Sequence, residues 1–352
     1  MRIITVDNVN EALPIGLRLL AMEGEPHESR AGLTLRMPEP VATVYRHPRE
    51  RVLFDPVRNA NPFFHFFEAL WLLRGREDVG FLAHFNSQMP QYSDNGTTFH
   101  GSYGARLRGR PVSREPDQID ALITLLYEEP DTRRGALQIW DHTRDLGVDS
   151  KDVPCNMMVA FRRDDENHLH MTVFNRSNDV IWGAYGANAV QFSMLLEYVA
   201  ARAGMAVGTY TQVSNDFHVY ESNPYWRHYT DQNHRVVFDP YSDRTTLENL
   251  FSSHSRSVDG VCVQPYDLFA DPMFEEDLED LFDVHDGRKE PWPAPSTHAM
   301  ERVVIPMYEA WAMHKAGHHN EALAAAATIA ADDWRVACEL WLLRAAQRKG
   351  AA

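Results

Sequence analysis

The stretch HLHMTVFNRSNDVIWGAYGANAVQFSMLLEYVAARAG, residues 168–204, decides the fold class of this chain. Its first part, 168–175, alternates apolar and polar residues over a length that is typical of a strand. Its last part, 187–204, is an apolar-rich run that predicts a long helix closed by Gly204. Polar residues, Arg176 first among them, stand between the two parts, where the local pattern calls for apolar side chains.

The rest of the chain mixes strand and helix patterns. Extended segments or strands are expected at 29–58, 135–141, 156–163 and 206–220, and further helices at 61–75 and 117–130. Strands and helices do not alternate regularly along the chain. This order predicts an α/β (α+β) domain built in layers.

The chain has 352 residues, enough for one large domain or two smaller ones. Residues 1–240 contain all the candidate site residues and are expected to form the catalytic domain. Residues 241–352 turn polar and acidic, pass a proline-rich linker at 290–296 and finish in alanine-rich helices at 319–347. This C-terminal extension is expected to be partly helical and to pack on the same domain.

Composition argues against several classes of protein. Apolar residues make up 44% of the chain, but no apolar run approaches the length of a membrane span, and the N-terminus lacks a signal-peptide pattern. The net charge of −16 argues against a nucleic-acid groove, although a local arginine cluster can still bind a small phosphorylated ligand. Three scattered cysteines argue against a disulfide framework and a thiolate metal site, so we expect no metal and a cytoplasmic location.

Cys155, in DVPCNMMVAFRR (152–163), has two interpretations. A free cysteine most often packs as a small buried hydrophobe, but its thiolate is also a strong nucleophile. Glu68 raises a similar question because it lies in the apolar run FFHFFEALW (63–71). A glutamate in such surroundings must be paired, protonated or facing a cavity.

Other polar residues have ordinary explanations when each is taken alone. A strand-end arginine such as Arg176, or the pair Arg133 and Arg134 at a turn, is usually a solvated surface charge. His218 and Tyr220 alternate along a strand pattern and therefore share one face of it. The order of all these residues along the chain is stronger evidence for one function than any single residue.

In order and spacing, these residues resemble the thymidylate synthase superfamily. The matching stretches lie within about residues 28–223 and are ESRAG, FFEALWLLRG, FHGSYGARLR, EPDTRRG, VPCN, NRSNDVIWGAYGAN and NDFHVY. The resemblance implies a thymidylate synthase-like layered fold with a bent mixed sheet. It also implies a homodimer that acts on a pyrimidine nucleoside monophosphate, with 5,10-methylenetetrahydrofolate as co-substrate.

The resemblance also implies a role for each matching residue. The catalytic positions are the nucleophile Cys155, Glu68 for proton transfers at C5, Tyr103 and Asn156. The nucleotide-binding positions are Arg30, Arg133, Arg134, Arg176, Ser177, Asn188, His218 and Tyr220, of which Arg133 and Arg134 reach the phosphate bound by the other subunit. The folate-binding positions are Asp179 and Arg58.

These residue types suit the chemistry. C5 of a pyrimidine is not nucleophilic until a thiolate adds to C6, which is covalent catalysis. Arginines anchor the phosphate and so hold C6 near the sulfur. The charge of Arg176 is expected to lower the pKa of the Cys155 thiol, and the apolar surroundings of Glu68 are expected to raise the pKa of its carboxyl group.

Four departures from the methylating members of the superfamily favour a hydroxymethyl product. The segment between Phe85 and Tyr103 has no tryptophan, Asn156 replaces a histidine, the loop at 183–188 is one residue longer, and the last residues are not a short apolar lid. Together these changes are expected to admit water to the methylene group, which hydride would otherwise reduce. Hydroxymethylation is therefore predicted, with thymidylate synthesis as the alternative.

The base that the site takes stays open at this point. In the superfamily, members with an amide at the position of Asn188 act on uracil, whereas members that hydroxymethylate deoxycytidylate commonly have an aspartate there. A rotated amide can still pair with cytosine because it has both a donor and an acceptor. We favour cytosine, and the sequence excludes neither sugar.

Three other classes of function compete with the transferase. A non-catalytic nucleotide binder would need no thiol, so Cys155 argues against it. A Cys–His hydrolase using His168, His170 or His218 would leave the arginines unexplained and lacks a glycine turn beside the cysteine. An RNA-binding role fits poorly with the acidic composition.

Overall fold

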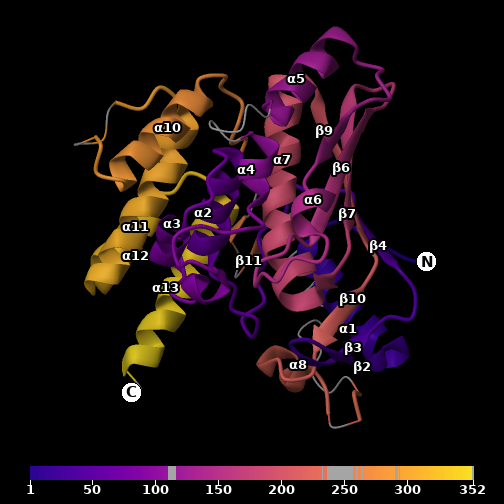
Figure 1. Ribbon diagram of the computed structural model, residues 1–352. Coiled ribbons are helices and arrows are strands. Elements are labelled where there is room, and N and C mark those ends of the chain that lie inside the picture. Colours follow the sequence, from indigo (N-terminus) through magenta and orange to yellow (C-terminus); the bar gives the residue numbers. More distant parts are fainter. Residues whose placement is uncertain are drawn as a thin grey trace.

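The computed structural model describes residues 1–109, 116–231, 233–235, 257–258, 261–262, 265–289, 292 and 294–350. Its layers run from a large sheet, through the helices α2 (Pro62–Leu73) and α7 (Asn188–Arg202), to a group of C-terminal helices (Figure 1). The α/β layered fold expected from the sequence is therefore confirmed. Within the described residues, none of the helices has the length and apolar character needed to cross a bilayer.

The large sheet has six strands in the order β1-β4-β9-β7-β6-β5. They are β1 (Arg2–Val6), β4 (Val41–Tyr45), β9 (Ala206–Ser214), β7 (His168–Asn175), β6 (Asn156–Arg163) and β5 (Ala136–Gln138). The pairs β1/β4 and β7/β9 are parallel and the other three are antiparallel, so the sheet is mixed, as expected. Antiparallel pairing of β6 with β7 places Asn175, at the end of β7, beside Asn156, at the start of β6.

A smaller sheet has the order β2-β3-β10-β8, with the strands β2 (Glu25–Ser29), β3 (Gly32–Arg36), β10 (Phe217–Tyr220) and β8 (Asn178–Asp179). Its strand β10 corrects the single strand expected over 206–220. The chain turns after Ser214, so that β9 belongs to the large sheet and β10 to the small one. This turn carries His218 and Tyr220 away from the large sheet. A third pair joins β11 (Ser257–Val258) to β12 (Val261–Cys262).

The helix α2 forms where the sequence predicted one. Asn61 caps its N-terminus by accepting a hydrogen bond from the backbone N–H of Phe64, and Pro62 occupies the first turn. Gly75 follows its end with a φ of 75°, and a Cβ there would lie 2.6 Å from the Cβ of Arg108. Every residue of α2 except Phe64 is buried, so neighbouring layers cover the helix on all sides.

The helix α7 follows a π-helical segment, Val180–Ala187, that the sequence did not predict. Tyr185 and Gly186 inside this segment leave helical geometry. A Cβ on Gly186 would lie 2.9 Å from the carbonyl oxygen of Ile181, so the bend requires glycine.

The remaining helices surround these two. Those of the first 230 residues are α1 (Val9–Glu23), α3 (Val79–Phe85), α4 (Tyr103–Leu107), α5 (Gln118–Glu128), α6 (His142–Asp145) and α8 (Pro224–Tyr229), with a short 3-10 turn at Met89–Tyr92. Those of the extension are α10 (Phe274–His285), α11 (Ile305–Ala316) with a π turn before it at Met300–Val304, α12 (His319–Ala326) and α13 (Asp332–Gly350). The sequence did not predict β1, α1 or α10.

The C-terminal helices cover the outer side of α2. Phe63 lies between two tryptophans of the extension, with ring centroids 5.4 Å from Trp311 and 5.9 Å from Trp341. Phe66 lies 5.0 Å from Trp334 in an edge-to-face contact. The described part of the extension therefore shares the core of the first domain, and the boundary expected near residue 240 lies outside the described residues.

Replacing Phe63 by alanine should destabilise the protein by about 3–5 kcal/mol, because the ring is fully buried between two tryptophans. Urea unfolding followed by circular dichroism measures this loss. Tyr127→Ala is the control, since Tyr127 is 77% exposed and its loss should change stability by about 0.5 kcal/mol or less. Equal, small effects of the two changes would contradict the packing of the extension on α2.

Candidate active site

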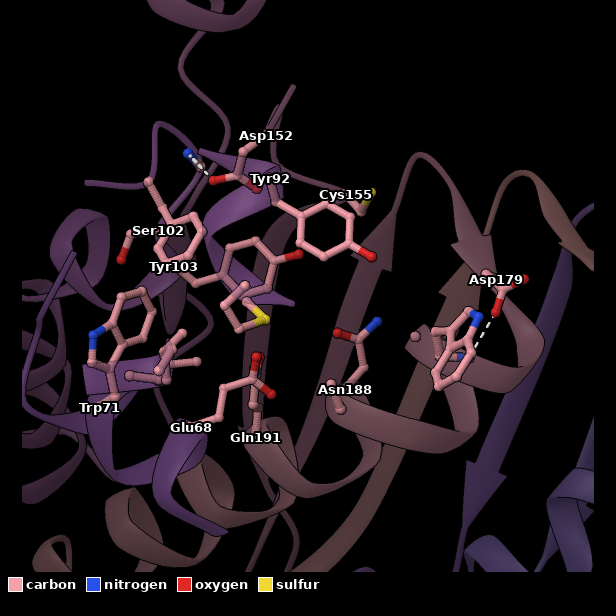
Figure 2. Close-up of a pocket in the computed structure, with 18 of the residues that line it drawn as sticks. Glu68, Trp71, Tyr92, Ser102, Tyr103, Asp152, Cys155, Asp179, Asn188 and Gln191 are labelled. Atoms are coloured by element: carbon pink, nitrogen blue, oxygen red, sulfur yellow. Dashed lines mark hydrogen bonds between the residues drawn. The ribbon is translucent and has the colours of Figure 1, made fainter. Parts of the chain in front are cut away.

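Two cavities meet at Cys155. The first, of about 320 Å³, lies between α2, α7 and the loop before α4, and Figure 2 shows Glu68, Tyr103, Asn188 and Cys155 around it. The second, of about 500 Å³, lies on the other side of the cysteine. It is lined by Ser29, Arg30, Ala31, Trp140, Asp145, Val148, Lys151, Asp152, Val153, Arg176, Ser177 and Tyr220. Cys155 is therefore a half-buried cavity residue and not a core residue.

Arg176 lies directly beside the sulfur of Cys155. Its Nη2 is 3.8 Å from Sγ, and its Nε and Nη2 donate hydrogen bonds to the carbonyl oxygens of Pro154 (2.8 Å) and Val153 (2.9 Å). The backbone N–H of Arg176 also donates to the carbonyl oxygen of Cys155. The guanidinium is thus held in place by the main chain that carries the thiol.

Arg176 lowers the pKa of the Cys155 thiol, as predicted, but the net shift of that pKa is upward. Burial is the largest cause, since it disfavours the thiolate, and Asp152 acts in the same direction. Arg176 and Arg30 lower the pKa but do not outweigh the burial. The thiol therefore depends on the arginines to reach its thiolate form.

Glu68 faces the first cavity from α2 and is 8% exposed. Burial raises the pKa of its carboxyl group to about 7, against a weaker effect of a hydrogen bond with Gln191. Its Oε2 has no hydrogen-bond partner among the described residues. The expectation of a raised pKa agrees with this geometry, and the group can exchange a proton near neutral pH.

Tyr103 and Asn188 line the first cavity, whereas Asn156 lies behind its wall. Asn156 is fully buried, and its Nδ2 donates to Oδ1 of Asn188 at 3.1 Å. Burial is the main cause that raises the pKa of Tyr103, whose hydroxyl also contacts the side chain of Asn156. Asn156 thus lines neither cavity and contacts Asn188, and its catalytic role stays a prediction.

Asp179 lines the first cavity and caps the π-helical segment. Its Oδ1 accepts hydrogen bonds from the backbone N–H groups of Ile181 (3.0 Å) and Trp182 (2.6 Å). Its Oδ2 is buried and has no partner among the described residues, and burial raises its pKa. Arg58 is 4% exposed and lines neither cavity. Its guanidinium lies 4.3 Å from the ring centre of Trp182 and donates a hydrogen bond to the carbonyl oxygen of Ile181.

The other nucleotide-binding candidates fall into two groups. Arg30, Ser177 and Tyr220 line the second cavity together with Arg176. His218 is not among the residues that line either cavity, but its ring lies edge-on 5.3 Å from that of Tyr220. Burial acts to lower the pKa of His218, but a 2.9 Å hydrogen bond to Asp216 leaves it raised.

Arg133 and Arg134 lie far from Cys155 of their own chain. They precede β5, whose Ala136 pairs with Ala160, so the register places them beside the last residues of β6, at the end that is opposite to Cys155. Seven to eight residues at about 3.3 Å per residue give a separation of about 25 Å. Both side chains are exposed, and Arg134 forms a two-pronged ion pair with Glu129.

The structure does not assemble a Cys–His hydrolase site from His168 and His170. Both histidines contact Asp164, at the end of β7 that is far from Cys155. Among the described residues, no group of histidine, cysteine and acidic side chains could hold a metal ion.

Several cavity residues escaped prediction, among them the polar Lys151, Asp152, Asn178 and Gln191. Gln191 could have been found, because it stands three residues after Asn188 and so shares a face of α7. Lys151 and Asp152 border both cavities, and Oδ2 of Asp152 accepts a hydrogen bond from the backbone N–H of Gly101. Nothing in their local sequence distinguishes them from a polar loop.

The comparison with family models agrees with this arrangement. A model described as thymidylate synthase matches residues 58–257, which is more than half of the chain. The chain belongs to the thymidylate synthase family. It is therefore a one-carbon transferase, and the superfamily and enzyme class expected from its motifs are confirmed.

Three relatives in this family carry the same name. A deoxyuridylate hydroxymethyltransferase of Pseudomonas phage M6 is 40% identical over 355 residues, covering 98% of this chain and 94% of the relative. Proteins of that name from Bacillus phage SP01 and Delftia phage PhiW-14 are 39% and 32% identical, covering 54% and 62% of this chain and 51% and 62% of their own lengths. The M6 relative thus matches the C-terminal extension as well as the part common to the thymidylate synthase family.

Glu68→Gln should stabilise this thymidylate synthase family member at alkaline pH and leave its stability nearly unchanged at acid pH. The folded pKa of about 7 lies above the ordinary 4.5, so wild-type stability is fully present below pH 4.5 and falls as pH rises through 7. The wild type should therefore lose up to about 3 kcal/mol relative to the variant between pH 4.5 and 8. Urea unfolding of the wild type and Glu68→Gln across this pH range measures the difference in stability. Glu25→Gln, on the surface, is the control and should follow the wild type. If the stabilities of wild type and Glu68→Gln change in parallel with pH, burial does not perturb the carboxyl group of Glu68.

Proposed function

We propose that this protein transfers a one-carbon unit from 5,10-methylenetetrahydrofolate to C5 of deoxyuridylate and releases 5-hydroxymethyldeoxyuridylate. The observation that carries the proposal is the position of Cys155, which borders both an arginine-bearing cavity and a cavity with a protonatable glutamate. A phosphate in the second cavity and a pyrimidine in the first would bring C6 of the base to the sulfur. A nucleotide monophosphate fits this pair of cavities better than a free base or a nucleoside.

The second cavity supports binding of the phosphate group. Arg30 and Arg176 contribute guanidinium groups, and Ser177 contributes a hydroxyl group. Guanidinium groups bind phosphate oxygens in charge-assisted pairs, which are stronger than neutral hydrogen bonds. Tyr220, with His218 behind it, is available for the sugar hydroxyl.

The proposed reaction balances without an external oxidant or reductant. Sγ of Cys155 bonds to C6, and C5 then bonds to the one-carbon unit and loses its proton, with Glu68 placed to organise proton transfer. Tetrahydrofolate leaves, the oxygen of a water molecule bonds to the methylene carbon, and the proton of that water is released. The bond between Sγ and C6 finally breaks, which restores the ring and the thiol.

The aromatic lining of the first cavity supports binding of the folate. Trp71, Tyr92 and Trp182 contribute aromatic surface, and the unpartnered Oδ2 of Asp179 is a buried acceptor for the N–H groups of a pterin. The folate would supply the one-carbon unit, while these residues orient it. Arg58, packed under Trp182, is proposed to support this wall and not to reach the folate directly.

Two considerations favour hydroxymethylation of uracil. The relatives named deoxyuridylate hydroxymethyltransferase include one that covers nearly the whole chain. The cavity wall also includes the polar residues Ser102, Lys151 and Asp152, which a water molecule can use as partners. The slight preference for cytosine drawn from the sequence receives no support from these relatives, and we therefore propose uracil.

We also propose that the active unit is a homodimer. Arg133 and Arg134 are too far from Cys155 to reach the phosphate cavity of their own chain, which supports their use in a partner's site. Met158, Phe174 and Val213 form a row of half-buried or exposed apolar side chains on the face of the large sheet opposite to the buried Val173. Such a face suits a second copy of this chain.

Product analysis tests the reaction. The protein should convert dUMP, in preference to dCMP, UMP or CMP, to a product whose mass increases by CH₂O, with no absorbance rise from dihydrofolate. Cys155→Ala should abolish both product formation and exchange of the C5 proton, because no adduct at C6 can form. A mass increase of CH₂ with dihydrofolate release would establish thymidylate synthesis instead, and exchange that survives in Cys155→Ala would refute the nucleophile.

Subunit mixing tests the dimer. Cys155→Ala and the double variant Arg133→Ala/Arg134→Ala should each be inactive alone. After mixing in equal amounts with subunit exchange, about a quarter of wild-type activity should return, since half of the dimers are mixed and each has one intact site. Failure to regain activity, with exchange shown by mass spectrometry, would contradict sites shared between subunits.

A further inference from the structure

We propose that Asn178 is a specificity-determining positioning residue that holds the amide of Asn188 in one orientation, so that the site reads the edge of one pyrimidine and rejects the other. This inference rests on the proposed function insofar as a pyrimidine binds beside Cys155. It extends that function by naming Asn178 and Gln212, which lie outside the expected set, as residues that help to decide the base. They act through Asn188, together with Asn156.

Four side-chain amides form a continuous chain of hydrogen bonds. Nδ2 of Asn156 donates to Oδ1 of Asn188 at 3.1 Å, and Nδ2 of Asn188 donates to Oδ1 of Asn178 at 3.0 Å. Nδ2 of Asn178 then donates to Oε1 of Gln212 at 3.1 Å and to the hydroxyl of Ser214 at 2.9 Å. Asn188, Asn178 and Gln212 thus each use the oxygen on one side and the nitrogen on the other, and Asn156 ends the chain with its nitrogen.

The far end of this chain fixes its direction. Nε2 of Gln212 donates to the main-chain carbonyl oxygen of Ala184 at 2.8 Å. A carbonyl oxygen only accepts hydrogen bonds, so the nitrogen of Gln212 must face Ala184 and its oxygen must face Asn178. The same requirement then passes through Asn178 to Asn188, whose nitrogen must face Asn178 and whose oxygen must face Asn156.

Burial makes this direction costly to reverse. The exposed fractions are 0% for Asn156, 1% for Gln212, 2% for Asn178 and 5% for Asn188, so bulk water cannot replace a lost partner. Gly183 leaves the room that the contact needs, because a Cβ there would lie 2.8 Å from Oδ1 of Asn178. Rotating Asn188 alone would set nitrogen against nitrogen at Asn156 and oxygen against oxygen at Asn178.

The consequence concerns the base. Uracil presents an acceptor at O4 and a donor at N3, whereas cytosine presents a donor at N4 and an acceptor at N3. After its bonds to Asn156 and Asn178, Asn188 keeps one N–H group and one lone pair for the cavity that it lines. A free amide could rotate to suit either base, but a fixed amide matches one base and opposes the other.

The test compares binding of dUMP and dCMP by calorimetry in four forms of the full-length protein. In the wild type one nucleotide should bind much more tightly. Asn178→Leu removes the acceptor that Nδ2 of Asn188 needs and cuts the link from Asn188 to Gln212, so the ratio of the two dissociation constants should fall about ten- to hundredfold, as expected for one mismatched buried pair. Asn178→Asp keeps an acceptor toward Asn188 and should retain most of the ratio.

Asn10→Leu is the matched control. Asn10 is also a buried amide, with hydrogen bonds to Val52 (2.9 Å) and Phe54 (2.9 Å), but it lies outside the chain. Its loss should lower thermal stability without changing the ratio. An unchanged ratio in Asn178→Leu, an equal fall in Asn10→Leu, or a wild type that binds both nucleotides alike would overturn the inference.

Binding keeps this test separate from the proposed function. A wild type that discriminates in binding but forms no hydroxymethylated product would overturn the proposed reaction and leave the role of Asn178 supported. A wild type that prefers dCMP would overturn the proposed base, while the fall of the ratio in Asn178→Leu would still support the fixed amide. If the wild type forms the hydroxymethylated product but Asn178→Leu keeps the wild-type ratio of dissociation constants, the proposed reaction would be supported and the role of Asn178 overturned.

Discussion

The contact between Cys155 and Arg176 is the interaction on which the site depends. Burial alone would keep the thiol protonated, and the guanidinium 3.8 Å from its sulfur opposes that effect. The arginine cannot move away easily, because carbonyl oxygens of the residues just before the cysteine hold two of its nitrogens. The same guanidinium faces the cavity proposed for the phosphate, so one side chain would couple substrate anchoring to the state of the nucleophile.

The second constraint comes from the layers around α2. Glu68 has a raised pKa because burial disfavours its charged form, and the C-terminal helices contribute part of the cover of its helix through contacts of Trp311, Trp334 and Trp341 with Phe63 and Phe66. The extension lies outside the stretch that matches the thymidylate synthase family model, apart from its first residues. Its packing nevertheless bears on the electrostatics of a proposed catalytic residue, since removing it would expose the far side of α2 to water.

Local pattern was sufficient for much of the fold. The strands β6 and β7 and the helices α2, α5 and α7 lie where periodicity and capping residues predicted them, because their apolar residues face one core. The N-terminal β1 and α1, the acidic helix α10 and the π-helical segment before α7 were missed. The run 206–220 looked like one strand, since each half alternates correctly, and only the pairing partners divide it between two sheets.

By itself the sequence determined the family, the enzyme class and the residue types of the site, because these depend on the order of motifs along the chain. The tertiary structure decided which of those residues share a cavity. It separated Arg133 and Arg134 from Cys155, moved Asn156 behind the wall and showed that burial outweighs Arg176 at the thiol. It also joined Asn156, Asn178, Asn188 and Gln212, which lie on different elements, into one directed chain of amides. Distances and burial between segments far apart in sequence set these properties, and no local pattern encodes them.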